Sequence, residues 1–208
     1  MLQHIIVTGC VAVGKSHISK ILKYQFKDVV MYPEFIYKDA FAMELLHRRF
    51  NNTVSALTFQ NFILDKWLLY KHENETATGI KIYERLPDDA VKVFAKLSLN
   101  EDEYKIQEER LKLLKLPSYD DMNKTNCTWI RYENNFTKDI TPLIEAVKST
   151  ATEFCVIEVR SSTAFDNYKH RNRKEEYYTF EEIEQLQQLY NEFTESQIKR
   201  IGCEVNYL

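Results

Sequence analysis

The octapeptide GCVAVGKS at residues 9–16 constrains this chain more than any other feature, and it holds two of only four glycines, Gly9 and Gly14. It fits the pattern G-x-x-x-x-G-K-[ST]. A β-branched run precedes it, and apolar residues at helical spacing follow. In a strand–loop–helix context, backbone N–H groups of such a loop surround a phosphate. Lys15 then reaches the outer phosphates and the Ser16 hydroxyl ligates Mg²⁺. We therefore expect a nucleoside triphosphate, ATP, to bind here with Mg²⁺.

Composition excludes several classes of protein. Apolar residues make up 44% and charged residues 28% of the 208, which is typical of a globular chain, and we expect one domain over residues 1–208. A net charge of −3 gives no reason to expect nucleic acid as a partner. No apolar run approaches the ~20 residues of a membrane span, and residues 1–9 have no basic leader region, so we expect neither a membrane segment nor a signal peptide.

The four cysteines stand far apart without a metal-binding spacing, which favours reduced thiols and a cytoplasmic location.

Strands and helices are expected to alternate along the chain. We expect strands over residues 4–8, 29–32, 79–83 and 154–159, with further candidates at 127–132 and 201–207. Helices are expected over 16–26, 40–50, 58–70, most of 91–116, 140–148 and 180–200. The alternation predicts an α/β fold with a five-stranded parallel sheet and helices on both faces.

Charged residues follow two of the expected strands. Glu34 comes after the second strand, and Glu84 and Arg85 come after the third. In a parallel sheet these positions share one rim with the phosphate loop. Glu34 is suited to accept a proton from an attacking hydroxyl, and Arg85 to hold that carboxylate and balance developing charge. A structural ion pair at the rim is the alternative.

Two helical positions predict a pocket for a nucleobase. Gln60 and Trp67 lie seven residues apart, so they project from the same side of a helix. A glutamine amide can donate to and accept from a base edge, and Phe59 and Trp67 can supply aromatic surface. The alternative is that the aromatic residues only fill the core.

The densest basic cluster is KHRNRK at residues 169–174. Lys169 and Arg173 share a helix face, and such a segment can close over phosphates and neutralise their charge. The alternative is a solvated helix face.

Taken in order, five motifs give the chain a family resemblance. They are residues 9–16, Pro33-Glu34, Phe59-Gln60, Glu84-Arg85 and Arg171-x-Arg173-x-Glu175-Glu176. From residue 4 to about residue 193 the chain resembles the deoxynucleoside kinases, which include deoxycytidine, deoxyguanosine and mitochondrial thymidine kinases. The resemblance implies a P-loop kinase fold with a basic lid. It also implies ATP-dependent phosphorylation of a deoxyribonucleoside 5′-hydroxyl, and a homodimer.

The resemblance also implies a role for each matching residue. Glu34 would be the general base, Arg85 would fix the 5′ end, and Glu84 would help to place Mg²⁺ through water. Gln60 would hydrogen-bond the base, Phe94 would stack on it, and Phe59 would line the pocket. The remaining assignments are Lys169, Arg171 and Arg173 on the donor phosphates and Glu176 on the 3′-hydroxyl.

The chain departs from the family pattern at several positions. Leu86 replaces the serine of Glu-Arg-Ser, Phe35 replaces a proline, and Arg49 or Phe50 stands where a tyrosine is expected. Residues 117–150 form a longer stretch than the family pattern has. Ala90 is small, as in the thymidine-type members, so we expect a pyrimidine preference, with Trp67 narrowing the pocket.

Two alternatives remain open at the level of sequence. A nucleoside monophosphate kinase similar to thymidylate kinase shares the phosphate loop and the lid. It needs a further basic group, which Arg49 or Lys38 could supply. A regulatory homologue that binds nucleotide without turnover is suggested by Leu86 and by the missing tyrosine.

Overall fold

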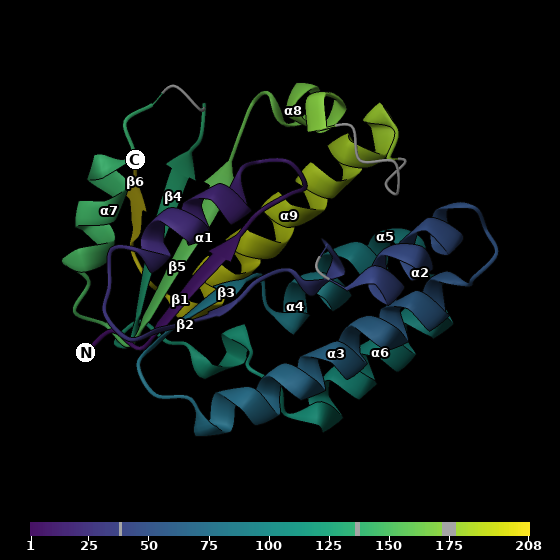
Figure 1. Ribbon diagram of the computed structural model, residues 1–208, viewed down its shortest axis with the longest axis horizontal. Coiled ribbons are helices and arrows are strands. Elements are labelled where there is room, and N and C mark those ends of the chain that lie inside the picture. The colour runs from purple at the N-terminus through teal and green to yellow at the C-terminus, as the bar shows by residue number, and fades with distance from the viewer. Residues whose placement is uncertain (38, 136–137, 172–177) are drawn as a thin grey trace.

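The computed structural model describes residues 1–208 except 38, 136–137 and 172–177. Its centre is a sheet with strand order β2-β3-β1-β5-β4-β6, in which every neighbouring pair is parallel (Figure 1). The strands are β1 (His4–Thr8), β2 (Val29–Tyr32), β3 (Ile80–Glu84), β4 (Cys127–Glu133), β5 (Phe154–Arg160) and β6 (Val205–Tyr207).

The sheet has six strands, so the prediction of five was wrong. The two further strand candidates, residues 127–132 and 201–207, contain β4 and β6. These strands pair with each other, and Trp129 of β4 lies opposite Val205 of β6. β6 has only three residues and none of them is fully buried, so its periodicity could not decide its state. β4 lies outside β5 although it comes first in the chain. The long stretch 117–150 therefore adds a strand to the sheet.

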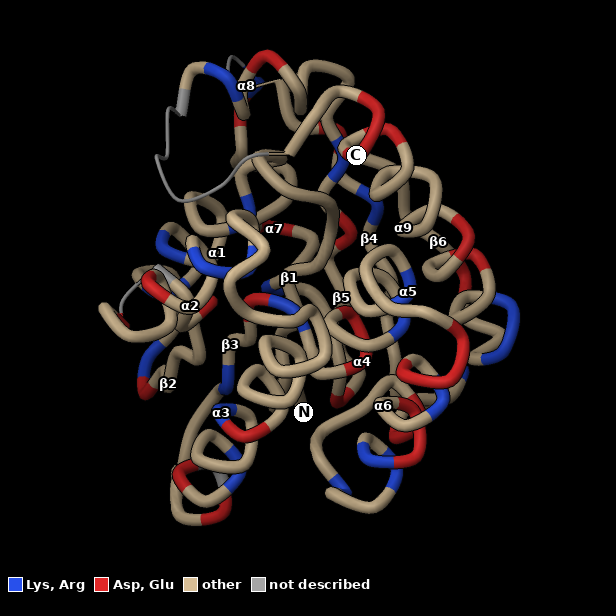
Figure 2. The backbone as a smooth tube through the Cα atoms, turned by 90° about the vertical axis from the view of Figure 1, so that its right-hand side faces the viewer, with Lys and Arg blue, Asp and Glu red and all other residues tan. Residues whose placement is uncertain are grey.

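Helices cover both faces of the sheet, with α1 (Lys15–Lys23) and α9 (Phe180–Ile201) on opposite sides of the strands (Figure 2). The other helices of five residues or more are α2 (Ala40–Phe50), α3 (Ala56–Thr76), η2 (Ala90–Ala95), α6 (Glu101–Leu114), α7 (Thr141–Lys148) and α8 (Ala164–Arg171). Short turns complete the set: η1 (Phe35–Tyr37), α4 (Pro87–Asp89), α5 (Lys96–Ser98) and η3 (Tyr119–Asp121).

The helix expected over residues 91–116 is interrupted. A wide π-helical turn, η2, precedes the short α5, and α6 begins anew after Asn100. The Asn100 side chain accepts from the Glu103 N–H, while the Glu103 carboxylate accepts from the Asn100 N–H. This reciprocal cap fixes a helix start at Asn100, because it satisfies N–H groups that the first helical turn leaves unpaired. The wide turn places Ala90 and Phe94 beside the cavity described below.

The core lies between the sheet and the helices that cover it. β1 and β5 are buried on both faces, as central strands of a parallel sheet are. α1 contributes Ile18 and Leu22, and α9 contributes Ile183 and Leu186. Within the described residues, no helix combines the length and the apolar composition that a membrane crossing requires.

Candidate functional site

Only glycine fits at the start of the phosphate loop, which joins β1 to α1. Gly9 has φ +136°, and a Cβ atom built there would lie 2.3 Å from the carbonyl oxygen of Val159. Gly14, directly before α1, has φ +98°. Ala12 also has positive φ, at 58°. Alternation of this kind turns successive backbone N–H groups toward one concave side, which makes an anion-binding site.

Lys15 is buried beneath this loop with 5% of its surface exposed. Its ammonium donates to the carbonyl oxygen of Cys10 at 2.5 Å. Burial, and then the nearby charge of Arg85, lower the pKa of Lys15 to about 7, although Glu34 acts in the opposite direction. A phosphate bound in the loop would supply the missing counter-charge and raise the pKa again.

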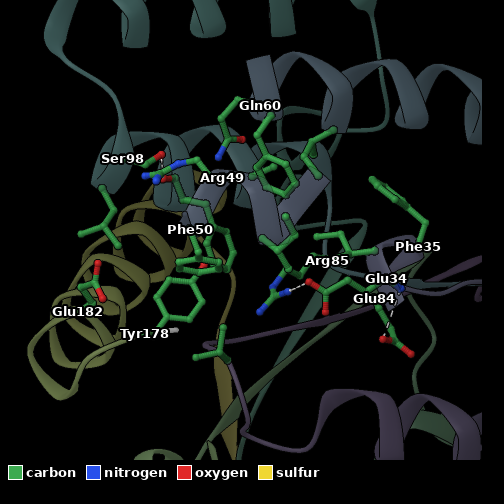
Figure 3. A pocket seen from close by; sticks show the side chains of 18 of the residues that line it. Glu34, Phe35, Arg49, Phe50, Gln60, Glu84, Arg85, Ser98, Tyr178 and Glu182 are labelled. Atoms are coloured by element: carbon green, nitrogen blue, oxygen red, sulfur yellow. Dashed lines mark hydrogen bonds and ion pairs between the residues drawn. The ribbon is translucent and has the colours of Figure 1, made fainter. Parts of the chain in front are cut away.

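Glu34 and Arg85 form an ion pair at the rim of the sheet (Figure 3). Glu34 follows β2, and Arg85 follows β3 with φ +69°, a conformation that non-glycine residues rarely adopt. Burial lowers the pKa of the Arg85 guanidinium, but the nearby groups that favour its charge, Glu34 foremost and then Tyr190 and Asp89, together outweigh burial, and the net shift is upward. Arg85 therefore stays charged.

Arg85 also connects the ion pair to its surroundings. Its Nη2 donates to the carbonyl oxygen of Gly9 at 3.2 Å. The guanidinium lies over the rings of Phe94 and Tyr190, at 4.8 and 5.8 Å from their centres. One side chain thus contacts the phosphate loop, the Glu34 carboxylate and an aromatic wall.

Ser16 and Glu84 bring two oxygen ligands together beside the loop. The Ser16 hydroxyl donates to Oε2 of Glu84 at 2.8 Å, and the Glu34 N–H donates to the same oxygen at 3.4 Å. Within the described ranges there is no cluster of three or more His, Cys, Asp and Glu that could hold a metal alone. One hydroxyl, one carboxylate and donor phosphates are nonetheless the oxygen-rich set that Mg²⁺ takes in phosphoryl-transfer sites.

A cavity of about 400 Å³ opens beside this rim. Seven of the residues that the sequence assigned to the acceptor line it together. They are Glu34, Phe59, Gln60, Trp67, Arg85, Ala90 and Phe94. Gln60 is 5% exposed, and it lines the cavity (Figure 3). An amide in this position can donate to and accept from a bound molecule, which indicates a ligand contact.

Four further residues line the cavity. The sequence analysis noted two of them only as departures from the family pattern, and it did not predict the other two. Arg49 and Phe50, noted as departures, both line it, and the Phe50 ring meets Tyr178 edge to face at 5.0 Å between centres. Tyr178 and Glu182 were missed. Glu182 forms a capping box with Thr179 at the start of α9, and the spacing Thr-x-x-Glu was readable.

Asp89 is a second omission. It is fully buried, it accepts from the hydroxyl of Thr8 and from the N–H of Leu86, and burial raises the pKa of its carboxyl. Leu86, which occupies the serine position of the family motif, also lines the cavity with its side chain. Asp89 thus connects the turn after β3 to the end of β1. The sequence alone does not reveal this role, because an acidic residue shortly after Pro87 carries no recognisable motif.

The expected basic lid lies mostly outside the described part of the chain. Lys169 is exposed on α8, with its ammonium 4.3 Å from the ring centre of Phe165, and it does not line the cavity. The side chain of Arg171 and all of Arg173 and Glu176 lie outside the described residues, as does Lys38.

Comparison with known proteins adds one family and one fold. The family model "Deoxynucleoside kinase" matches residues 5–205. Deoxyadenosine kinase from M. mycoides, solved with the products dCMP and a flexible dCDP, superposes with a TM-score of 0.68 at 19% identity, covering 98% of this chain and 89% of that one. The same enzyme with bound dCTP gives 0.64 at 19% identity and the same coverage. No curated protein sequence matches the chain. At this identity the structural likeness concerns the fold.

Proposed function

We propose that this chain, which belongs to the deoxynucleoside kinase family, transfers the terminal phosphoryl group of ATP to the 5′-hydroxyl of a deoxyribonucleoside. Family membership makes it a nucleoside kinase, and the proposal adds the acceptor atom and the residues. The observation that carries it is the position of the Glu34–Arg85 pair. Arg85 contacts a carbonyl of the phosphate loop, and both residues line the acceptor cavity.

Glu34 acts as the general base in this proposal. Its carboxylate takes the proton of the 5′-hydroxyl while that oxygen attacks the terminal phosphorus of ATP. A new P–O bond forms, the bond to the leaving ADP oxygen breaks, and the proton remains on Glu34. Arg85 holds the carboxylate in place and contributes positive charge near the transferred group. Mg²⁺, bound to the phosphates beside Ser16 and Glu84, would neutralise phosphate charge.

The cavity lining supports a pyrimidine base in the acceptor. Gln60 offers one donor and one acceptor to the base edge, and the Phe94 ring offers a stacking surface. Trp67 is 5% exposed and packs edge to face on Tyr70 at 5.6 Å between ring centres, so the indole is held in place and limits the space for a larger purine. We therefore propose a preference for pyrimidine deoxynucleosides.

Turnover with defined acceptors tests this function. The protein is incubated with ATP, Mg²⁺ and each of the four common deoxynucleosides, and the 5′-monophosphate is quantified. We expect product from thymidine or deoxycytidine at a higher kcat/KM than from the purines. No monophosphate from any acceptor, together with intact ATP binding, would favour a regulatory nucleotide-binding protein instead.

One observation favours a second candidate, a nucleoside monophosphate kinase. Arg49 is half-buried on the cavity wall, and its guanidinium has no ion-pair partner among the described residues. An acceptor phosphate is a suitable partner for such a cation. Supplying thymidine and its monophosphate in parallel distinguishes the two. A higher kcat/KM for the monophosphate would replace the first proposal by the second.

We also propose a homodimer. Leu69 on α3 and Ile106 and Leu113 on α6 are exposed by 56%, 52% and 80%, and these two helices pack against each other at one side of the molecule. Apolar side chains gathered on neighbouring helices are typical of a subunit interface. Sedimentation equilibrium is expected to give twice the monomer mass of 24.8 kDa, and a single-chain mass at micromolar concentration would contradict it.

A further inference from the structure

Asn134, directly after β4, contacts the phosphate loop from the side opposite the acceptor. Its side-chain Nδ2 donates to the carbonyl oxygen of Val13 at 2.7 Å, across 121 positions of sequence. Asn134 is 6% exposed, and its own backbone N–H donates to the carbonyl oxygen of Arg160 at 2.8 Å. The backbone of Asn134 is therefore anchored to the sheet, and the residue is buried.

The carbonyl that Asn134 holds determines where a phosphate-binding N–H points. The peptide unit between Val13 and Gly14 is planar and trans, so its carbonyl and its N–H point in opposite directions. Fixing the Val13 oxygen on the side of Asn134 aims the Gly14 N–H away from it. Gly14 has φ +98° and could adopt other conformations at little expense.

Packing anchors the side chains of the loop, because Cys10, Val11 and Val13 are buried in the core. The loop also borders a second cavity, of about 240 Å³, at Gly9, Cys10 and Val13. The orientation of single peptide units is set by side-chain hydrogen bonds to the loop carbonyls. Arg85 donates to Gly9 from the acceptor side, and Asn134 donates to Val13 from the β4 side.

We infer that Asn134 is a positioning residue that sets the phosphate loop in the conformation that binds the phosphates of a nucleoside triphosphate. Asn134 touches no substrate in this account, and it acts through the Val13–Gly14 peptide. The inference rests on the proposed function, because it takes the donor to be ATP. It also gives a role to the stretch 117–150, since the added strand β4 delivers Asn134 to the loop.

The test separates donor binding from acceptor binding. Asn134→Asp keeps the size of the side chain but replaces the N–H donor by an oxygen. Asn134→Ser adds no charge, but its side chain is too short to reach the Val13 carbonyl. We expect KM for ATP to rise about 10-fold or more in both, as loss of a buried hydrogen bond implies. We expect KM for the deoxynucleoside to stay within about 2-fold. Calorimetric titration with ATP and, separately, with the deoxynucleoside should show the same split.

The matched control is Asn126→Ser, at the opposite end of β4. Its amide also donates to a backbone carbonyl, that of Asp121 at 3.2 Å, but remote from the phosphate loop. It should leave both KM values unchanged. ATP affinity equal to wild type in both Asn134 variants would overturn the inference, and so would an equal loss for ATP and the deoxynucleoside. Absence of any wild-type turnover would instead count against the proposed function, while the ATP titrations would still decide the role of Asn134.

Discussion

Glu34→Gln is expected to lower kcat by roughly 10²–10⁴ while changing KM for either substrate little, because the amide can no longer take the proton of the 5′-hydroxyl. Glutamine keeps the size of the side chain and an oxygen that can accept from Arg85, so the rim should stay assembled. The measurement is steady-state turnover with ATP, Mg²⁺ and the best deoxynucleoside acceptor.

Glu44→Gln serves as the matched control for this experiment. Glu44 is exposed on α2 and does not line the cavity, so its replacement should leave kcat unchanged. A Glu34→Gln variant that retains near-normal kcat would show that Glu34 and Arg85 are a structural ion pair at the sheet rim. A variant whose melting temperature falls far below wild type would be reassessed with Glu34→Asp, which keeps the base and should keep more activity than the amide.

Lys15→Met is expected to raise the stability of the protein without ligand and to weaken ATP binding roughly 10–150-fold, as loss of a hydrogen bond to a charged group implies. The folded protein holds Lys15 with a pKa of about 7, against 10.5 for an ordinary lysine. Between these values the unfolded chain binds the extra proton, so the free energy of unfolding of the wild type rises with pH there. Below pH 7 Lys15 is charged in both the folded and the unfolded state, so the cost of burying its ammonium lowers the free energy of unfolding by its full amount.

The gain from Lys15→Met should therefore be greatest near pH 6.5 and should vanish toward pH 10. Thermal melting across this range measures it, and each kcal/mol gained corresponds to about 2–4 °C for a chain of this length. Lys20→Met, exposed on the same helix, should show no such pH dependence. A Lys15→Met variant that is less stable than wild type at pH 6.5, or that binds ATP normally, would contradict the account of Lys15.

Local patterns were sufficient for the parts of the site that lie near strand ends. The phosphate loop, Glu34 and Arg85 each follow a strand whose apolar run is visible in sequence, and parallel strands place such positions on one rim. Gln60 and Trp67 were predictable for a similar reason, because helical spacing fixes which residues share a side.

Contacts between distant segments could not be predicted in this way. Asn134 meets Val13 only because β4 lies outside β5, and strand order is a property of the whole sheet. The same limit applies to β6, which is too short to show a period. Glu182 lines the cavity because of the direction in which α9 enters the fold, although its capping motif was visible.

The most direct test of the central claim is a crystal structure with a deoxynucleoside and a non-hydrolysable ATP analogue. The account predicts the triphosphate in the loop at residues 9–16, the base beside Gln60 and the sugar 5′-oxygen about 2.6–3.2 Å from the Glu34 carboxylate. A 5′-oxygen directed away from Glu34, or a nucleoside bound outside the cavity, would contradict it.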